Sequence, residues 1–419
     1  MIFIPQNFFG IFLVLKQKNN LFHLTIISQQ SDIQGITTVE SINHRKEKSQ
    51  YGKNVAKLSI TGSKIIARNC YICNKMGRLC YISRCYRDYR SAGNKAKIDN
   101  EQSLKEMGAI NLGLSQRIGG GKIATFIAGV CGVARYALKV RKGDVVVLQY
   151  PIKKYFSLIC RISRLRGATT IAFIHDLGSF RRKKLTPRQE IRRLNHADNV
   201  IAANASMERW LSEQGCRCRL SWLGLHDYRS PAQAPQRPYS RRKVVVYAGS
   251  LNNRKNSFLL QLPAIAHNVD IHLYGDKENL YGMEASDSLK INGFMDADEF
   301  ISSVKGDFGL VWDGNSSDEC SGNWGEYLKI NTPHKVSFYI RSHLPVVVWK
   351  QSAVASIVEK EGIGVCINSL AELNRLNDIT EEKMTEMLAN VSRVAERLSK
   401  GDNFKHAIRE AIKQSLLSS

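Results

Sequence analysis

Short apolar runs alternate with helix-compatible stretches from Met76 onward, and this alternation restricts the fold more than any other feature of the sequence. A chain that forms strand and helix in turn builds parallel sheets covered by helices. The predicted strands are Cys80–Ser83, Val145–Gln149, Thr170–Ile174, Val200–Ala203, Val244–Ala248, Ile271–Tyr274, Leu289–Ile291, Phe308–Trp312 and Val346–Trp349. The predicted fold class is therefore α/β, with doubly wound parallel sheets.

The alternation is interrupted once, by the segment RSPAQAPQRPYSRR at residues 229–242. Its three closely spaced prolines exclude a helix or a central strand, so we interpret it as an interdomain linker. The chain is thereby divided into an N-terminal Rossmann-like domain at residues 76–238 and a C-terminal one at 239–419, which ends in helices. Ligands of such sheets bind beyond the carboxyl ends of the strands, which predicts a site in the cleft between the domains.

Residues 1–75 lack this pattern. The apolar run near Met1 is interrupted by polar residues and is too short for a membrane helix, and no signal-peptide cleavage site follows it. We expect either a poorly ordered extension or upstream sequence included by a wrong start codon.

The formal charge of +24 predicts an anionic partner, such as a phosphate-bearing substrate, an anionic membrane or nucleic acid. No basic patch interleaved with aromatic residues supports nucleic acid. Ten irregularly spaced cysteines are typical of free thiols in a reducing cytosol.

The segment from Asp307 to Trp349 has the features of an anion site. A strand leads into a loop rich in Gly and Asn, and a helix is predicted to open at Pro333. His334 and Lys335 then lie in its first turn, where unpaired backbone N–H groups attract an anion. A lysine there opposes the helix dipole unless an anion offsets it, so Lys335 is a candidate diphosphate ligand.

A second candidate phosphate loop follows the first strand of the C-terminal domain. Gly249 allows close backbone approach, and Arg254 or Lys255 supplies positive charge. An ordinary turn with a solvated basic face explains the same residues, and the sequence leaves both interpretations open.

Two loops of the N-terminal domain carry further candidates. His175 and Asp176 directly follow a strand, where either could act as general base toward an acceptor hydroxyl; the alternative is that Asp176 caps the following turn. Gly93 and Asn94 are predicted in the loop before the first helix, facing the ligand, although Asn94 could instead be a cap.

Six strings in order, YISR with SAGNKAK, LQYPIKKYF, IHDLGSFRR, LNHADNVIAANASMERWL, DFGLVWDG and GEYLKINTPHKVSFYI, resemble a bacterial glycosyltransferase family. That family contains the β-1,6-galactofuranosyltransferases of polysaccharide synthesis and the accessory glucosyltransferases of serine-rich adhesins. The resemblance covers roughly residues 78 to 412, and Cys85 stands where the similar motif has an Asn. It implies the GT-B fold, with two Rossmann-like domains, a nucleotide-sugar donor on the C-terminal domain, the acceptor on the N-terminal domain, and neither cofactor nor metal.

The resemblance also implies residue roles. Its donor-site residues are Gly249, Lys255, Asn331, His334, Lys335 and Tyr339, with Gly93 and Asn94 reaching the diphosphate from the N-terminal domain. The base is expected to be Asp176 in the first place and His175 in the second.

The function expected on this basis is transfer of a hexosyl group, galactofuranosyl, from a UDP-sugar to a hydroxyl of a growing cell-surface glycan. One alternative is a UDP-glucose-dependent glucosyltransferase that acts on a protein-linked glycan, and a more distant one is a non-enzymatic nucleic-acid-binding protein. We expect a cytoplasmic protein whose basic surface contacts the inner membrane leaflet, where a lipid-diphosphate-linked acceptor lies, although a solvated Lys/Arg face is the alternative. A homo-oligomer is left open.

Overall fold

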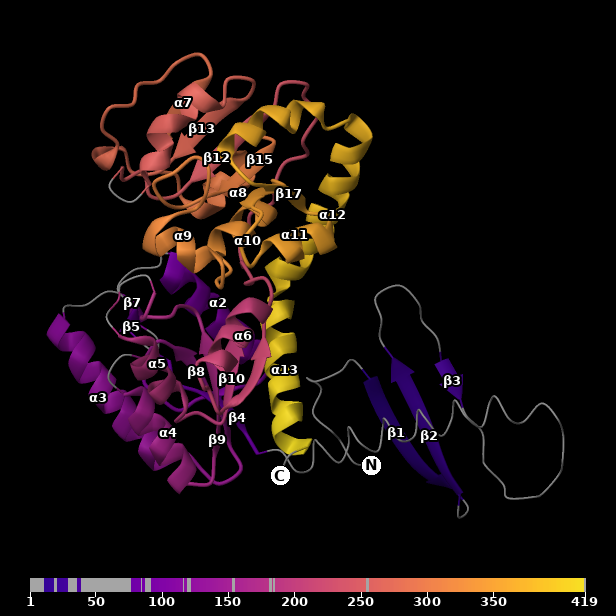
Figure 1. Cartoon of the computed structure of the whole chain (residues 1–419). Helices are drawn as coiled ribbons and strands as arrows, with labels where there is room; N and C mark the ends of the chain where they lie inside the picture. Colours follow the sequence, from indigo (N-terminus) through magenta and orange to yellow (C-terminus); the bar gives the residue numbers. More distant parts are fainter. Residues whose placement is uncertain are drawn as a thin grey trace. The chain divides into compact units, whose positions relative to one another are not determined.

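The computed structural model describes residues 11–18, 21–28, 36–38, 77–83, 85–86, 92–115, 117–118, 122–152, 155–180, 183, 185–253 and 256–417. The chain forms two compact units, of which one contains residues 1–76 and 106–108. In that unit β1 (Ile11–Lys18), β2 (Leu21–Ser28) and β3 (Ile36–Thr38) form an antiparallel sheet (Figure 1). The interpretation of residues 1–75 as an extension or as upstream sequence stays a prediction.

The N-terminal domain of the second unit contains a six-stranded parallel sheet of order β11-β10-β9-β8-β4-β6. Its strands are β4 (Leu79–Tyr81), β6 (Ile110–Asn111), β8 (Val145–Tyr150), β9 (Thr169–Ile174), β10 (Asn199–Ala202) and β11 (Arg219–Trp222). The helices of this domain are α2 (Ala92–Glu106), α3 (Lys122–Lys139), α4 (Phe156–Leu165), α5 (Pro187–Leu194) and α6 (Ala205–Glu213). A short parallel pair, β5 (Cys85–Tyr86) and β7 (Arg117–Ile118), lies outside the sheet.

The C-terminal domain repeats the design with a six-stranded parallel sheet of order β14-β13-β12-β15-β16-β17. Its strands are β12 (Val244–Ala248), β13 (Asp270–Tyr274), β14 (Leu289–Gly293), β15 (Phe308–Val311), β16 (Val346–Trp349) and β17 (Gly364–Ile367). Its α-helices are α7 (Leu262–Ile265), α8 (Ala297–Ser303), α9 (Gly322–Leu328), α10 (His334–Arg341), α11 (Ala355–Glu361) and α12 (Glu381–Lys400), and its 3-10 helices are η1 (Ser257–Gln261), η2 (Lys277–Asn279) and η3 (Leu370–Asp378). The fold class is the one predicted.

Strand β12 shows why this sheet is buried on both faces. Val245 and Tyr247 pack into one hydrophobic cluster, and Val246 and Ala248 pack into a second cluster on the opposite face. Side chains alternate between the faces of a strand, so a run of apolar residues requires cover on both sides. The helices supply that cover.

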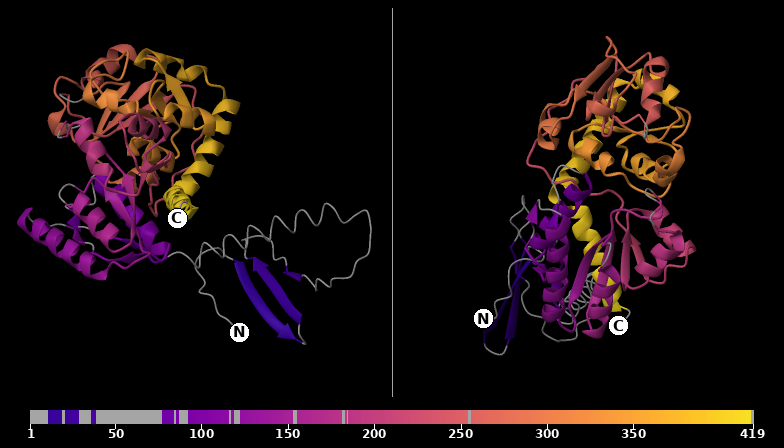
Figure 2. Two further views of the ribbon diagram at one scale, coloured as in Figure 1. Left: turned by 60° about the horizontal axis from the view of Figure 1, so that its bottom comes forward. Right: turned by 90° about the vertical axis from the view of Figure 1, so that its left-hand side faces the viewer.

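The linker and the last helix connect the domains at one place. No helix or strand forms between β11 and β12, as the prolines predicted. The partly buried Arg237 donates hydrogen bonds to the carbonyl oxygens of Val304, Gly306, Ser342 and His343, which fixes the linker to the C-terminal domain. Helix α13 (Asp402–Leu417) follows α12 and packs on β9, β10 and β11 of the N-terminal domain (Figures 1 and 2).

Two local predictions were wrong. Gly93 and Asn94 do not precede the first helix, because α2 already begins at Ala92 and includes both in its first turn. The predicted loop at residues 313–325 contains the start of α9, which was not predicted because its Gly and Asn residues have low helix propensity. The prediction that a helix opens at Pro333 is confirmed, since Pro333 is the N-cap of α10.

Candidate functional site

A pocket of about 240 Å³ lies at the carboxyl ends of the strands and takes its lining from both domains. Parallel strands present their ends together, which brings residues distant in sequence to this edge. The lining residues are Ala96, His175, His226, Ser250, Asp313, Trp324, Tyr327, Leu328, Asn331, Thr332, Pro333, His334 and Lys335. Helix α9, the first turn of α10 and the segment between them together contribute eight of the thirteen.

The wall from the C-terminal domain is organised around Lys335. Its Nζ atom lies 3.8 Å from Asp313 Oδ1, at the end of β15, and 4.3 Å from the centre of the Tyr247 ring. A Cβ atom on Gly249 would lie 3.4 Å from the same Nζ. The ammonium group is therefore held at the junction of two strand ends and the first turn of α10, an arrangement suited to an anion such as a diphosphate.

Tyr339, one turn further along α10, lies in the core and not at the pocket. Its side chain is fully buried, and its hydroxyl accepts a hydrogen bond of 2.7 Å from the Ala248 N–H. The ring packs on Gly309, where an added Cβ would lie only 2.3 Å from Tyr339 Cγ. Tyr339 is not among the residues that line the pocket; it joins α10 to the end of β12, just before Gly249, and its assignment to the donor site stays a prediction.

On the side of the N-terminal domain, His175 lines the pocket, and Asp176 is not among the lining residues. Gln149 Nε2 donates to the Lys97 carbonyl oxygen, so its Oε1 atom faces His175 Nε2 at 2.8 Å as an acceptor. His175 Nε2 therefore carries a proton and donates it to this oxygen. The sequence did not indicate Gln149.

Three imidazoles form a row at the pocket. His226 stacks on His175 with 6.1 Å between ring centres, and His334 follows at 5.7 Å from His226. Burial lowers the pKa of His226 to about 4, and burial together with repulsion by His226 and Lys95 lowers the pKa of His334 to about 3. Both rings are neutral at pH 7.

His334 also has a defined tautomer. Its Nε2 atom lies 3.2 Å from the Asp227 carbonyl oxygen, which only accepts, so Nε2 carries the proton. The buried Nδ1 atom accepts no hydrogen bond within the described part of the chain. A buried acceptor without a partner is costly, and a ligand hydroxyl or N–H would satisfy it.

Buried Glu190 of α5 orders the loop that follows β9. Its carboxylate accepts hydrogen bonds from the Tyr150 hydroxyl, the Gly178 N–H, and both the N–H and hydroxyl of Ser179. These contacts fix the residues directly after His175 and Asp176. Sequence reasoning missed this role because α5 has the appearance of an ordinary surface helix.

Contacts between the domains place the pocket wall of the C-terminal domain against the N-terminal domain. The Tyr327 hydroxyl accepts from the Leu177 N–H at 2.9 Å, and its ring stacks on Phe180. Asn204 Nδ2 donates to Thr332 Oγ1 at 2.9 Å. The quoted strings GEYLKINTPHK and IHDLGSF contain most of these residues, but only the fold shows that they meet.

The remaining predicted donor residues differ in position. Asn331 lines the pocket, and its buried Oδ1 atom lacks a hydrogen-bond partner among the residues described. Gly93 and Asn94 lie in the turn of α2 before Ala96, which lines the pocket. Lys255 lies outside the described residues.

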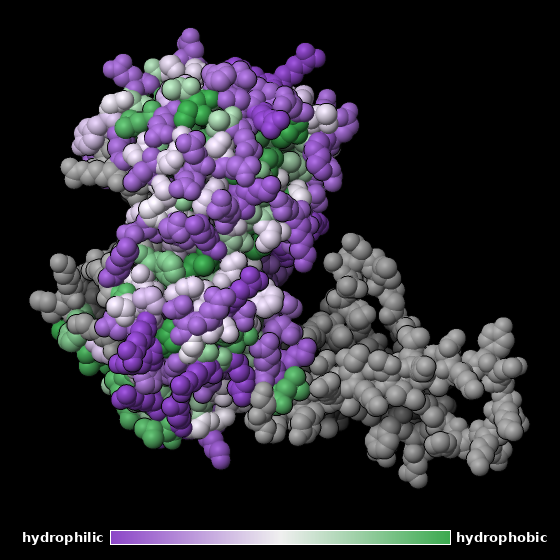
Figure 3. Space-filling model, viewed as in Figure 1, coloured by the Kyte–Doolittle hydropathy of each residue, from purple (hydrophilic) through white to green (hydrophobic). Residues whose placement is uncertain are grey.

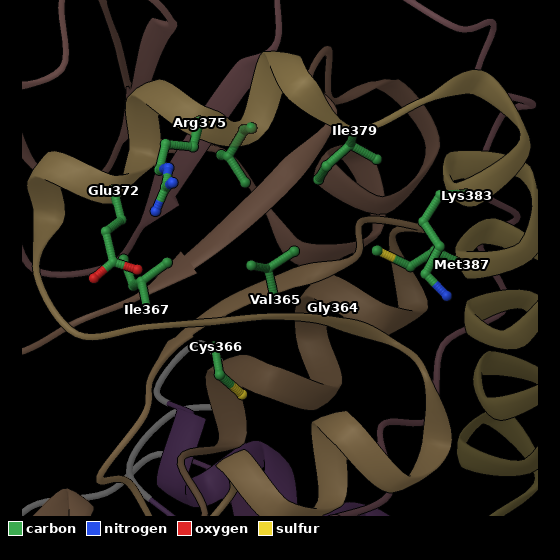
Figure 4. Close-up of a pocket in the computed structure, with 10 residues that line it drawn as sticks. Gly364, Val365, Cys366, Ile367, Glu372, Arg375, Ile379, Lys383 and Met387 are labelled. Carbon is green, nitrogen blue, oxygen red and sulfur yellow. The ribbon is translucent and has the colours of Figure 1, made fainter.

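A second, larger pocket of about 460 Å³ lies beside β17, between η3 and α12 (Figure 4). Its lining is mainly aliphatic, with Glu372 and Arg375 at one end and Lys383 at the other. It lacks the convergent donors and imidazoles of the first pocket, so we assign the candidate site to the smaller one.

Two negative observations apply to the described ranges. No group of three or more His, Cys, Asp or Glu side chains there is arranged to hold a metal ion. None of the helices in those ranges combines the length and apolar character needed to cross a membrane.

Comparison with known proteins identifies both domains. The N-terminal domain model of the glucosyltransferase 3-like family matches residues 79–224, and its C-terminal domain model matches residues 245–411. The β-1,6-galactofuranosyltransferase WbbI of Escherichia coli K12 is 28% identical over 336 residues, which is 77% of this chain and 95% of the relative. Glucosyltransferase 3 of Streptococcus parasanguinis is 23% identical over 289 residues, 66% of this chain and 81% of the relative.

A solved structure shares the fold. The glycosyltransferase from Rickettsia africae superimposes with a TM-score of 0.51 at 11% identity, covering 82% of this chain and 99% of its own. At this identity the likeness concerns the arrangement of the two Rossmann-like domains, the GT-B fold.

Proposed function

The chain belongs to the glucosyltransferase 3-like family of GT-B glycosyltransferases, and we propose that it transfers a galactofuranosyl group from a UDP-sugar to a hydroxyl of a growing cell-surface glycan. The observation that carries the choice of sugar is the similarity to WbbI, which extends over 95% of that relative. The alternative, a glucosyl group added to a protein-linked glycan, is favoured by the similarity to glucosyltransferase 3.

The pocket supports a division of roles. Lys335 and the first turn of α10 would hold the UDP diphosphate and stabilise its charge as it departs. His334 Nδ1 and Asn331 Oδ1 would accept hydrogen bonds from donor hydroxyl groups. No metal ion or other cofactor enters this proposal.

In the reaction, the acceptor oxygen attacks the anomeric carbon, and the bond from that carbon to the diphosphate oxygen breaks with its electron pair going to UDP. The acceptor proton passes to a base, which we assign to the His175–Asp176 pair. His175 lines the pocket and Asp176 does not, so we place His175 before Asp176 as the candidate base. The acceptor is proposed to be linked to a lipid diphosphate at the cytoplasmic membrane face.

Donor selection tests the proposal. The full-length protein is given UDP-galactofuranose, UDP-galactopyranose or UDP-glucose with a panel of octyl glycosides and a glycosylated serine peptide. UDP release and product linkage are then measured. Turnover confined to UDP-galactofuranose and a glycoside supports the proposal, whereas turnover with UDP-glucose on the peptide establishes the alternative. His175→Gln and Asp176→Asn are then compared on the donor and acceptor that give turnover. The variant that lacks the base should have a kcat about 10²- to 10⁴-fold lower than the wild type, with unchanged UDP affinity.

A further inference from the structure

Helix α3 exposes an apolar stripe on its outer side. Phe126, Val130 and Leu138 follow one another at multiples of four residues and are 50%, 45% and 83% exposed, and Ile127 beside them is 55% exposed. Tyr136, on the side of α3 opposite Ile127, is fully buried in the core. A helix that is apolar toward both core and solvent is unusual in a domain surrounded by water.

Helix α4 extends this surface. Leu158 and Leu165 are 47% and 86% exposed, and α4 packs beside α3. Arg166, just after α4, donates from Nη2 to the Ala137 carbonyl oxygen of α3 at 3.2 Å, which joins the two helix ends. Apolar side chains follow the lower-left edge of the molecule over both helices (Figure 3). We call Phe126, Ile127, Val130, Leu138, Leu158 and Leu165 the α3–α4 face.

The charges around the α3–α4 face have one sign. Residues 122–168 contain ten Lys and Arg and a single acidic residue, Asp144. The Asp144 side chain is only 2% exposed and forms an ion pair of 2.7 Å with Arg78. Arg135, Lys139, Arg161 and Arg164 are exposed on the same two helices. Solvent therefore meets apolar and cationic groups here, and no carboxylate of this segment.

We propose that the α3–α4 face binds the surface of an anionic lipid bilayer. Exposed aliphatic side chains can enter the headgroup region, while the surrounding Lys and Arg contact anionic lipid phosphates. This inference concerns a surface outside the pocket and does not depend on the donor sugar.

Two other partners fit the same face less well. A second copy of the chain would bring cations against cations, because the face has no exposed acidic residue of its own to pair with them. Nucleic acid would use the cations, but its bases stack on aromatic side chains, and Phe126 is the sole aromatic member of the face.

Vesicle flotation with the full-length protein tests the proposal. Vesicles of phosphatidylcholine alone are compared with vesicles containing a quarter phosphatidylglycerol. The protein should float with the anionic vesicles and not with the neutral ones. Ile127→Ser/Leu138→Ser should weaken binding at least about tenfold, and Arg135→Gln/Arg161→Gln about fivefold for each charge removed.

Matched substitutions on the C-terminal domain control for general effects. Leu260, 42% exposed, and the exposed Lys360 are changed to Ser and Gln and should leave flotation unchanged. All variants must keep the wild-type thermal midpoint and UDP affinity, so that a loss of lipid binding is separate from unfolding and from a failure of the proposed transfer. The proposal is overturned by equal binding to neutral vesicles, by no flotation, or by wild-type flotation of the α3 and α4 variants. Loss in these variants of self-association or of single-stranded RNA binding, without any vesicle binding, also overturns it.

Discussion

Gly309→Ala should destabilise the C-terminal domain far more than a single methyl group normally does. The new Cβ would lie 2.3, 2.5 and 2.7 Å from three ring carbons of Tyr339, whereas carbon atoms in contact prefer about 3.5 to 4.0 Å. The ring must therefore move by about 1 Å or more. That movement breaks the 2.7 Å hydrogen bond from the Ala248 N–H to the Tyr339 hydroxyl.

The cost follows from these two effects. Overpacking a core site costs about 1–3 kcal/mol, and a buried N–H left without a partner costs about another 1–3 kcal/mol. Replacing glycine by alanine lowers the conformational entropy of the unfolded chain, which offsets about 0.4–1 kcal/mol of this loss of stability. The free energy of unfolding should fall by about 2–5 kcal/mol, measured by urea denaturation. UDP affinity should fall as well, because Tyr339 and Lys335 share α10.

Two variants make this reasoning refutable. Gly132→Ala, inside α3, is the matched control: its Cβ would meet nothing closer than the Leu114 nitrogen at 3.9 Å, so it should be neutral or stabilising by up to about 1 kcal/mol. Adding Tyr339→Leu to Gly309→Ala should cost less than the sum of the single changes. Wild-type stability of Gly309→Ala, or strict additivity in the pair, would show that the ring contact does not control this region.

Three further outcomes are expected. Lys335→Met should weaken UDP binding, measured by calorimetry, about 10- to 100-fold, since a charge about 4 Å from a phosphate contributes up to about 4 kcal/mol at an effective dielectric of 20. The control Lys360→Met should leave UDP affinity unchanged. Equal UDP affinities of Lys335→Met and the wild type would exclude Lys335 from the site. Glu190→Gln should lower kcat with little effect on KM for the donor, because an NH2 group replaces one of the two oxygens that accept from Gly178 and Ser179 after His175. An unchanged kcat would contradict that positioning role. Burial depresses the pKa of His334, so its stabilising contribution is present above pH 6.5 and is lost as pH falls toward 3. Between pH 7.5 and 5 the free energy of unfolding should drop by about 2 kcal/mol more in the wild type than in His334→Gln. Equal drops in the two proteins would refute the buried neutral imidazole.

The strands that carry the core could be predicted because their sequences are continuous apolar runs. Val244–Ala248 and Val346–Trp349 coincide with β12 and β16. The short or mixed strands β6, β11 and β17 were missed, since sheet pairing and not composition makes them strands. Helix α9 was missed because its Gly and Asn lower helix propensity, and packing of Gly325 against Cys320 compensates.

Pocket-lining residues could be predicted where they follow a strand directly or open a helix. His175 was predicted in the first way and Lys335 in the second, and both line the pocket. Sequence could not show that Tyr339 turns into the core, because that depends on the space left by Gly309. His226 was missed because it lies between β11 and the linker, where no periodic pattern marks a buried side chain.

The return of α13 to the N-terminal domain gives the molecule a pivot. The chain passes between the domains twice, at Asp227–Tyr228 and at Gly401, and these two crossings are bonded together: the Asp227 carboxylate accepts the N–H groups of Asn403 and Phe404, and the Tyr228 N–H donates to the Leu398 carbonyl oxygen. Two bonded crossings form one narrow joint, whose axis passes through both. A rotation of the domains about this joint would leave the two crossings bonded, whereas a separation of the domains would break these hydrogen bonds; His334, bonded to the Asp227 carbonyl oxygen, lies at the joint and lines the pocket with His226.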